Sequence, residues 1–338
     1  MKKFCSIITV LVGILVLLPM LASCSEKPKM VEETRSLMGT YVKVVVYADE
    51  DIALEAINTA YKRMEEVIDI VTTYEEQGEA FKLNQDGYIE GPSEELREVI
   101  ETSIKYYTLT GGYFDITIQP LLDLWQFNPE TETQFWELDE SFQKVKIVEA
   151  KRLLGSLHII IEENKISFDK EGMKVTLNAI AKGYIVDEAL ETIESMGIKY
   201  ALVDAGGDIG TLGSKPKGEL WRISLVNPDD TSESLLSLRI HDMSVTTSGN
   251  YERYFDPEKE VGHILDPKTG YSSDAAISVT IISKDCTQGD ALATGVFVMG
   301  VEDGMTLIES LDNVECLIVD NDRNLHESSG LSEYLSER

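Results

Sequence analysis

The chain has 338 residues, of which 30 are lysine or arginine and 60 are aspartate or glutamate, so its formal net charge is −30 at pH 7. This charge argues against binding to nucleic acid and against direct adhesion to anionic lipid, because both are polyanions. An anionic small molecule would need a local positive group, and a divalent cation would supply one.

The first 23 residues predict a secretory signal of the lipoprotein type. A basic start precedes a nearly all-apolar run over residues 4–18, and small residues lead into Cys24. This pattern is typical of a signal peptide, and its end resembles the lipobox of bacterial lipoproteins. The run is shorter than the roughly 20 residues of a membrane-spanning helix, which favours cleavage. We therefore expect lipidation of Cys24, a tether over residues 24–31, and an extracytoplasmic protein anchored to a bacterial cell membrane.

Hydrophobic periodicity predicts strands and helices in mixed order and no repeats. Alternating valines predict a strand over residues 40–47, and apolar residues at helical spacing predict about 20 residues of amphipathic helix from Glu50. Pro92 and Gly111 bracket a second helix, and residues 129–150 predict a surface excursion. Later expected elements are a hairpin over 158–161 and 165–168, a helix over 181–196, a strand over 200–203, several strands between 221 and 247, a strand over 277–282, a buried helix over 290–299 and a strand over 314–319.

This order of elements predicts an α+β fold of mixed sheets with flanking helices. The chain that remains after residue 23 exceeds the usual size of one core, so we expect two closely packed subdomains. Cys286 and Cys316 could form a disulfide in an oxidising compartment. A chain of this length builds its own core, however, which favours two buried thiols.

Two glycine-rich segments are candidates for chemistry. Residues 245–270 bring together hydroxyl residues, glycines, aromatic residues and His263, one of only four histidines in the chain. A structural hairpin has no need of this combination. In the other segment a strand runs into Gly206 and Gly207, where backbone amides could approach a phosphate because glycine has no side chain. A plain turn is the alternative there.

Three further clusters carry charged or aromatic residues. Asp290 and Thr294 are four residues apart on one face of a helix, a donor pair that suits Mg²⁺, although Asp290 could simply cap the helix. Lys182 lies near a helix start, where a cation is unfavourable unless an anion lies close by; a solvated lysine is the alternative. The aromatic residues beside Asp115 could sandwich a flat ring or could pack in the core.

Taken in chain order, these clusters form a set of motifs. The motifs are Met38-Gly39-Thr40, Gly112-Tyr113-Phe114-Asp115, Ala179-Ile180-Ala181-Lys182-Gly183-Tyr184, Ala205-Gly206-Gly207-Asp208, Thr247-Ser248-Gly249, His263-Ile264-Leu265-Asp266-Pro267 and Asp290-Ala291-Leu292-Ala293-Thr294. Together they resemble the ApbE family of FAD:protein FMN transferases, over about residues 32–320. The resemblance implies a T-fold-like α+β domain over residues 32–325, followed by a polar tail over residues 326–338.

The resemblance also implies a reaction. FAD is cleaved at its pyrophosphate with the help of Mg²⁺, AMP leaves, and FMN is joined by a phosphoester bond to a threonine of an acceptor flavoprotein. Acceptors of this kind are membrane electron-transport subunits or other extracytoplasmic flavoproteins. Two alternatives stay open: an FAD pyrophosphatase, in which water attacks, and a lipoprotein that binds FAD without chemistry.

Candidate site residues follow from the resemblance. A metal would be held by the side chains of Asp290 and Thr294 and by the backbone oxygen of Ala179, with some relatives placing a further acidic ligand at the position of Ala293. The residues expected to contact FAD are Met38, Tyr74, Tyr113, Phe114, Asp115, Thr176, Lys182, Gly206, Gly207, Ser248, His263 and Leu265. His263 is also the candidate base for the acceptor threonine, since imidazoles titrate near neutral pH. Thr176-Leu177-Asn178 departs from the family's Asp-Leu-Gly, so a hydroxyl replaces a carboxylate.

Overall fold

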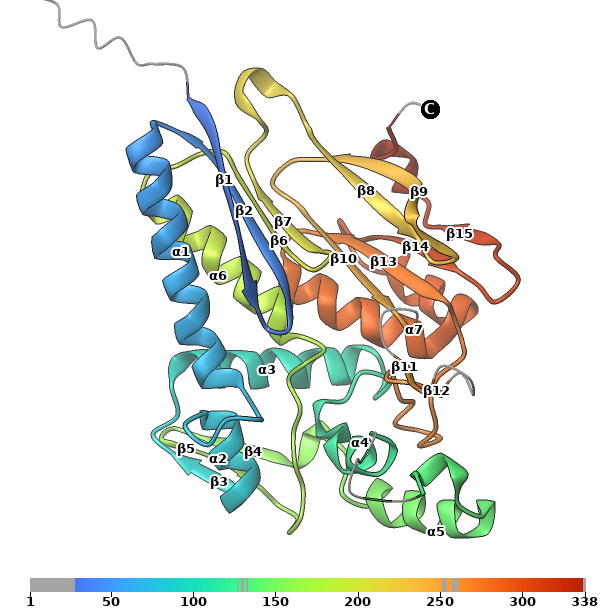
Figure 1. Cartoon of the computed structure of the whole chain (residues 1–338). Coiled ribbons are helices and arrows are strands. Elements are labelled where there is room, and N and C mark those ends of the chain that lie inside the picture. Colours follow the sequence, from blue (N-terminus) through green and yellow to red (C-terminus); the bar gives the residue numbers. More distant parts are fainter. Residues whose placement is uncertain are drawn as a thin grey trace, which may run out of the picture.

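The centre of the molecule is an eight-stranded sheet. The computed structural model describes residues 28–126, 128, 131, 133–250, 254–256 and 261–336, so the expected signal and Cys24 lie outside the described residues. All neighbouring strands of the sheet are antiparallel (Figure 1). In sheet order they are β1 (Lys29–Leu37), β2 (Thr40–Ala48), β6 (Ala201–Ala205), β7 (Asp208–Leu212), β10 (Ser244–Gly249), β13 (Ser278–Ser283), β14 (Glu315–Val319) and β15 (Leu325–Glu327).

The two faces of this sheet are covered by different elements. The helices α1 (Glu50–Val71), α6 (Ala181–Ser195) and α7 (Cys286–Ile308) cover one face (Figure 1), where Val42, Val44 and Val46 are fully buried. The hairpin of β8 (Trp221–Asn227) and β9 (Asp230–Ile240) covers the other face, packing Trp221 against a cluster that includes Val45. Successive side chains of a strand point to opposite faces, so the valine run of β2 supplies both cores.

A second, smaller part lies below the main sheet in Figure 1. It contains a three-stranded antiparallel sheet in the order β3-β5-β4 and four helices. These elements are α2 (Glu79–Asp86), β3 (Tyr88–Glu90), α3 (Glu94–Leu109), α4 (Gln119–Trp125), α5 (Glu140–Lys151), β4 (Ile159–Glu162) and β5 (Lys165–Phe168). A short pair, β11 (Tyr254–Asp256) and β12 (Val261–Gly262), lies between the two parts. The expected α+β class is confirmed, but the expectation of mixed sheets is wrong: the strand pairs of the described residues are antiparallel.

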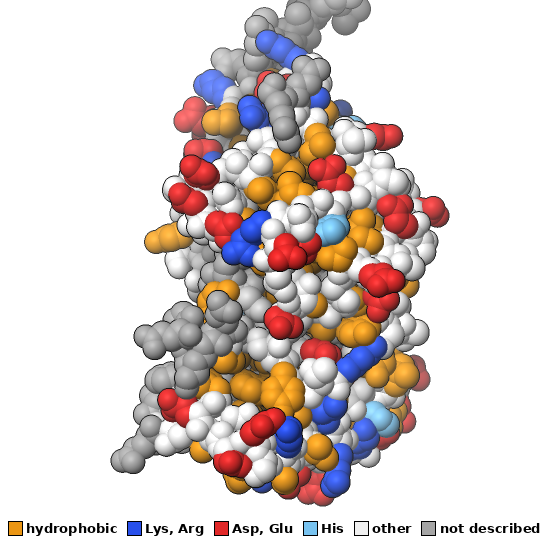
Figure 2. Space-filling model, turned by 90° about the vertical axis from the view of Figure 1, so that its right-hand side faces the viewer, with side chains coloured by type: hydrophobic (Ala, Val, Ile, Leu, Met, Phe, Trp, Pro, Cys, Tyr) orange, Lys and Arg blue, Asp and Glu red, His pale blue; other side chains and the backbone are white. Residues whose placement is uncertain are grey.

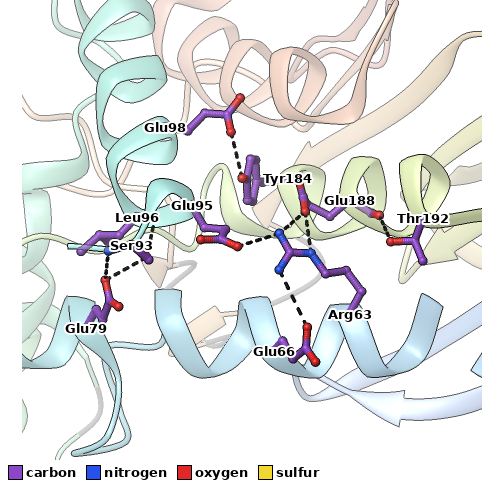
Figure 3. A network of polar contacts seen from close by, with 10 residues as sticks. All are labelled: Arg63, Glu66, Glu79, Ser93, Glu95, Leu96, Glu98, Tyr184, Glu188 and Thr192. Atoms are coloured by element: carbon purple, nitrogen blue, oxygen red, sulfur yellow. Dashed lines mark hydrogen bonds and ion pairs between the residues drawn. The ribbon is translucent and has the colours of Figure 1, made fainter. Parts of the chain in front are cut away.

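A partly buried ion-pair network ties the two parts together (Figure 3). Arg63 on α1 donates through Nη2 to Glu95 on α3 and through Nε to Glu188 on α6, each at 2.7 Å. Tyr184 on α6 donates to Glu98 on α3 at 3.0 Å. Because partly buried charges are costly unless they are paired, this network favours one arrangement of the three helices.

Three segments differ from the sequence expectations in extent. Residues 140–151 of the expected surface excursion form α5, which buries Ile147 and Ala150. Helix α7 begins at Cys286 and runs to Ile308, and its backbone breaks from helical geometry at Gly300, one residue after the expected end. The polar segment from residue 326 contributes to β15 and buries Leu331 in the β8–β9 core.

Helix α7 lies in the main core, where many of its side chains are buried. Among the described residues it alone has the length and apolar composition of a membrane span. However, Val296 and Phe297 are fully buried and the helix packs against β10 and β13, so it is a core helix here. Cys286 on this helix and Cys316 on β14 are both buried free thiols, and burial raises the pKa of each.

Helices α6 and α7 approach each other so closely at Gly183 that an added Cβ would lie 2.3 Å from the carbonyl oxygen of Cys286. We expect Gly183→Ala to lower the free energy of unfolding by about 1–3 kcal/mol, because the packed helices must separate. Glu194→Ala on the exposed side of α6 is the control, with an expected change within about 0.5 kcal/mol. Denaturant titration measures both, and equal stabilities would contradict the close-packing argument.

Candidate functional site

Two tight turns meet at one end of the strands of the main sheet. Met38 and Gly39 join β1 to β2, and Gly206 and Gly207 join β6 to β7; all four have positive φ, at 53°, 73°, 65° and 98° respectively. Two-residue hairpin turns of this kind require such backbone angles. A Cβ at Gly206 would lie 2.4 Å from Oγ1 of Thr40, so contact between the two turns excludes a side chain there. The plain-turn interpretation thus accounts for Gly206, whereas nothing lies within 4 Å of the position of a Cβ at Gly207.

Asp290 acts on the neighbouring helix rather than on its own helix end. Its carboxylate is 5 % exposed and accepts a hydrogen bond from the backbone N–H of Gly183 at 3.1 Å, in the first turn of α6. The N-cap of α7 is Asp285, which accepts from the backbone N–H of Gln288 at 2.8 Å. The idea that Asp290 caps its own helix is therefore wrong, and its oxygens lie at the meeting point of two helices.

Asp187 on α6 makes the complementary contact. Its carboxylate accepts from the backbone N–H groups of Cys286 and Thr287 at 2.9 and 2.8 Å, and from the Thr287 hydroxyl at 2.5 Å. Each helix thus supplies the carboxylate that satisfies the free N–H groups at the other's start. Burial raises the pKa of Asp187 to about 7, against the lowering effect of these hydrogen bonds.

The anion expected near Lys182 is another residue of the chain. Lys182 Nζ lies 2.5 Å from Oδ2 of Asp208, whose side chain is 1 % exposed. Asp208 follows the Gly206–Gly207 turn and also accepts weakly from the backbone N–H of Thr247 at 3.4 Å. The alternative of a solvated lysine is therefore wrong. The pair places a positive side chain, 30 % exposed, beside the turn.

A set of oxygen donors lies beside this pair. The hydroxyls of Ser248 on β10 and Thr294 on α7 are 3.2 Å apart, one helical turn from Asp290. Carboxylate, hydroxyl and carbonyl oxygens are the ligands that Mg²⁺ takes, and the partly buried Ala179 just before α6 would offer a carbonyl oxygen. Ala293 is fully buried and has no donor in its side chain. The described residues contain no group of three or more histidine, cysteine or acidic side chains that could hold a metal. A bound Mg²⁺ would complete its shell with water and phosphate oxygens, which is its usual habit. The residues present fit the ion.

The expected aromatic contacts divide into two kinds. Tyr74 is 68 % exposed and its hydroxyl accepts from Asn178 Nδ2 at 2.8 Å, while the Tyr113 ring has Lys268 Nζ 3.3 Å from its centroid. Both can meet a ligand. In contrast, Phe114 is 1 % exposed and belongs to the main core.

Asp115 and Thr176 hold the adjoining loops in place. Asp115 Oδ1 accepts from the hydroxyls of Thr117 and Ser156 at 2.6 and 2.7 Å, and burial raises the pKa of Asp115. Thr176 is buried and donates its backbone N–H to Ile116 at 2.8 Å. With Phe114, these side chains face inward, and they position the Tyr113 loop rather than presenting free groups. Met38 is half-buried and packs against the main core.

His263 follows β12 in a loop that is clamped on both sides. Asn250 accepts from the backbone N–H of Ile264 at 3.3 Å and donates to the carbonyl of Ser273 at 2.8 Å. Two residues beyond His263, Leu265 is 3 % exposed and joins an apolar cluster formed by α4 and α5. The segment 245–270 thus contributes the Ser248 hydroxyl beside Thr294 and the anchored loop of His263, although residues 251–253 and 257–260 lie outside the described residues.

Three positioning residues were not among the candidates: Asp187, Asp208 and Asn250. Asp187 lies three residues after Tyr184, the end of the Lys-Gly-Tyr motif, and Asp208 and Asn250 directly follow the Gly-Gly turn and the Thr-Ser-Gly end of β10. A polar residue adjoining each glycine-rich motif was the available signal. The sequence does not show which distant residue each of them contacts, and these contacts are what fix the loops and helices of the site.

Comparisons with known proteins identify the family of the chain. The model of the ApbE family matches residues 38–318. An FAD:protein FMN transferase of Vibrio cholerae is 33% identical over 326 residues, which cover 94% of this chain and 96% of that protein. The solved flavin transferase ApbE of Vibrio cholerae has a TM-score of 0.78 at 29% identity, and the ApbE protein of Thermotoga maritima has 0.82 at 28%. Both cover 91% of this chain, and the whole of each structure is matched.

The raised pKa of Asp187 predicts a pH-dependent stability. In the unfolded chain this carboxyl titrates near pH 3.8 and in the folded chain near 7, so the folded state binds the extra proton in between. Stability should therefore fall as the pH rises from about 4 to about 7 and should then level off. We expect Asp187→Asn to remove this part of the slope in denaturant titrations across that range. An unchanged slope in the variant would refute the assignment to Asp187.

Proposed function

Because the chain belongs to the ApbE family, we propose that its FAD:protein FMN transferase activity requires Mg²⁺ and modifies a threonine of an extracytoplasmic acceptor protein. The observation that carries the proposal is the cluster at the sheet edge. There the oxygens of Asp290, Thr294 and Ser248 lie beside the Lys182–Asp208 pair. A carboxylate and two hydroxyls would serve a phosphate admitted at Gly207, where nothing lies within 4 Å of the position of a Cβ.

Charge is the reason for the metal. The pyrophosphate of FAD is anionic, and it would approach a region that contains the carboxylates of Asp187, Asp208 and Asp290 but only Lys182 as a cation in the same set of contacts. Bound Mg²⁺ would neutralise the pyrophosphate and stabilise negative charge on the departing AMP. Asp290, Thr294 and the carbonyl oxygen of Ala179 would hold it.

The protein residues would perform the remaining steps. Tyr74 and Tyr113 would hold the flat rings of FAD. The Gly206–Gly207 turn would admit its phosphates. The threonine oxygen then bonds to the phosphorus of FMN while the bond from that phosphorus to the AMP oxygen breaks. His263 takes the hydroxyl proton, and Asn250 and the Leu265 cluster fix the loop that carries it.

We also propose that the enzyme is anchored through a lipid on Cys24. Support comes from the direction of β1, which starts at Lys29 and reaches the site at the Met38 turn, so the two ends of the strand lie at opposite ends of the sheet (Figure 1). A chain tethered upstream of Lys29 would turn its site away from the lipid and toward an acceptor.

The basic test is incubation of the protein with FAD, Mg²⁺ and an acceptor. Mass spectrometry should show the acceptor gaining the mass of FMN, with the label on a threonine. Release of AMP without labelling would instead indicate the pyrophosphatase, and intact FAD would indicate a binding protein.

Asp290→Asn tests the metal site. The amide keeps an oxygen for the Gly183 N–H but removes the charge, so we expect transfer to fall by at least the roughly 10–100-fold that is lost with outer-shell metal partners. Asp285→Asn, which changes a carboxylate at the start of the same helix, should keep its rate because asparagine also caps helices. If Asp290→Asn keeps full magnesium-dependent activity and folding, the ligand assignment is wrong.

His263→Ala tests the base. Loss of a general base should slow FMN transfer at neutral pH by about 100- to 10,000-fold, while FAD binding, followed by flavin fluorescence, should weaken far less because the other expected contacts remain. His241→Ala, at a histidine whose side chain is 57% exposed, is the control and should be silent. A His263→Ala enzyme with the normal rate would place the base elsewhere.

A further inference from the structure

The outer face of α5 carries a row of uncovered apolar side chains, which we call the α5 patch. Phe142, Val145 and Val148 follow one another at three-residue spacing and are 48, 55 and 53% exposed. The other side of the helix buries Ile147 and Ala150 in the α4–α5 cluster. Adjacent exposed apolar side chains rimmed by polar ones mark interaction sites on soluble proteins.

The patch carries a small positive excess in a chain whose net charge is −30. Residues 140–152 contain four basic and two acidic side chains; Lys144 pairs with Glu140 and Lys146 with Glu149, so Arg152 supplies the positive charge at the rim. Val145, Val148 and Arg152 line one shallow groove together with Lys144 and Glu149. On the face shown in Figure 2, orange and blue side chains lie next to each other in the lower part, the end of the molecule at which Figure 1 places α5. A partner that fits the patch is therefore apolar at its centre and acidic at its rim.

The inner face of the same helix supports the wall that carries His263. Ile147 shares the apolar cluster with Leu265 and packs so closely on Gly270 that an added Cβ there would lie 2.4 Å from its Cγ2. Lys151 Nζ donates to the carbonyl of Lys268. A molecule docked on the α5 patch would thus lie about one helix diameter, roughly 10 Å, from the segment 263–270.

We propose that the α5 patch docks the acceptor protein, whose surface around its threonine is apolar and acidic. This inference rests on the transferase function proposed above. A protein partner fits better than a lipid surface, because α5 lies at the end of the molecule opposite Pro28, the first described residue (Figure 1). An anchor at Cys24 would hold the patch away from the membrane. The patch extends the binding of the acceptor beyond the threonine itself.

The test compares a folded acceptor with a short peptide. The protein probe is one that carries FMN on threonine in normal cells and loses it when this chain is deleted; the peptide spans the same threonine. We expect Val145→Glu with Val148→Glu to raise the KM for the folded acceptor by about tenfold or more, because two buried apolar contacts are replaced by like charges. The kcat, the rate with the peptide and FAD binding should not change.

Two further variants control for folding and charge. Ile52→Glu with Val226→Glu adds the same charge at positions 49 and 45% exposed on α1 and β8, and should leave the KM unchanged. Arg152→Glu reverses a charge at the rim and leaves the apolar side chains of the patch unchanged. It should raise the KM for the folded acceptor more at low than at high salt, because salt screens the interaction between exposed charges.

An unchanged KM in both α5 variants would overturn the proposal. A change of oligomeric state in the α5 variants, seen by size-exclusion chromatography, would also overturn it, because the patch would then bind a second copy of the chain. Loss of binding of the variants to anionic phospholipid vesicles would overturn it as well, because the patch would then bind lipid. If the unaltered enzyme transfers no FMN to the probe, the proposed function fails separately. Calorimetric binding of the folded acceptor to the unaltered and variant proteins then decides the docking proposal.

Discussion

The site depends on two carboxylates, one on α6 and one on α7, each of which accepts hydrogen bonds at the start of the other helix. Asp187 on α6 satisfies the N–H groups at the start of α7, and Asp290 on α7 satisfies an N–H at the start of α6. Both contacts require the close approach that the missing side chain of Gly183 permits. Because partial positive charge concentrates at helix starts, the same geometry holds a carboxylate at the start of each helix. Lys182 adjoins Gly183 in the first turn of α6, and Thr294, whose hydroxyl is 3.2 Å from that of Ser248, lies one turn after Asp290 on α7.

Local sequence patterns predicted most of the elements but not the long-range partners. Alternating valines and helical spacing correctly predicted β2 and α1, since these patterns depend only on which side chains face the core. The amphipathic α5 was missed because the segment that precedes it is acidic and the whole stretch was interpreted as a surface excursion. The helical spacing of its buried side chains, Gln143, Ile147 and Ala150, was therefore overlooked. The break of α7 at Gly300 was taken for its end, although buried side chains beyond the break, such as Ile308, extend the helix.

Within the site, residue types were more predictable than roles. The oxygen donors of Asp290 and Thr294 follow from the chemistry of magnesium and from helical spacing. That Phe114 and Asp115 face inward depends on contacts with Ser156 and the core, which come from distant segments, as well as on the neighbouring Thr117. The anion near Lys182 was inferred correctly from an unfavourable helix position, but only the fold identifies it as Asp208. The local sequence indicates that a charged side chain requires a counter-ion, but it does not indicate which residue supplies that counter-ion.

Helix α5 separates two tasks by its periodicity. Side chains that face inward, such as Ile147, support the loop of His263, while Val145 and Val148 face solvent. If the outer side docks the acceptor as proposed, substitutions there would leave the inner contacts of Ile147 with Leu265 and Gly270 in place. Enzymes built on this scaffold would then diverge in the proteins they modify while keeping one reaction, because the two sets of contacts lie on opposite sides of α5.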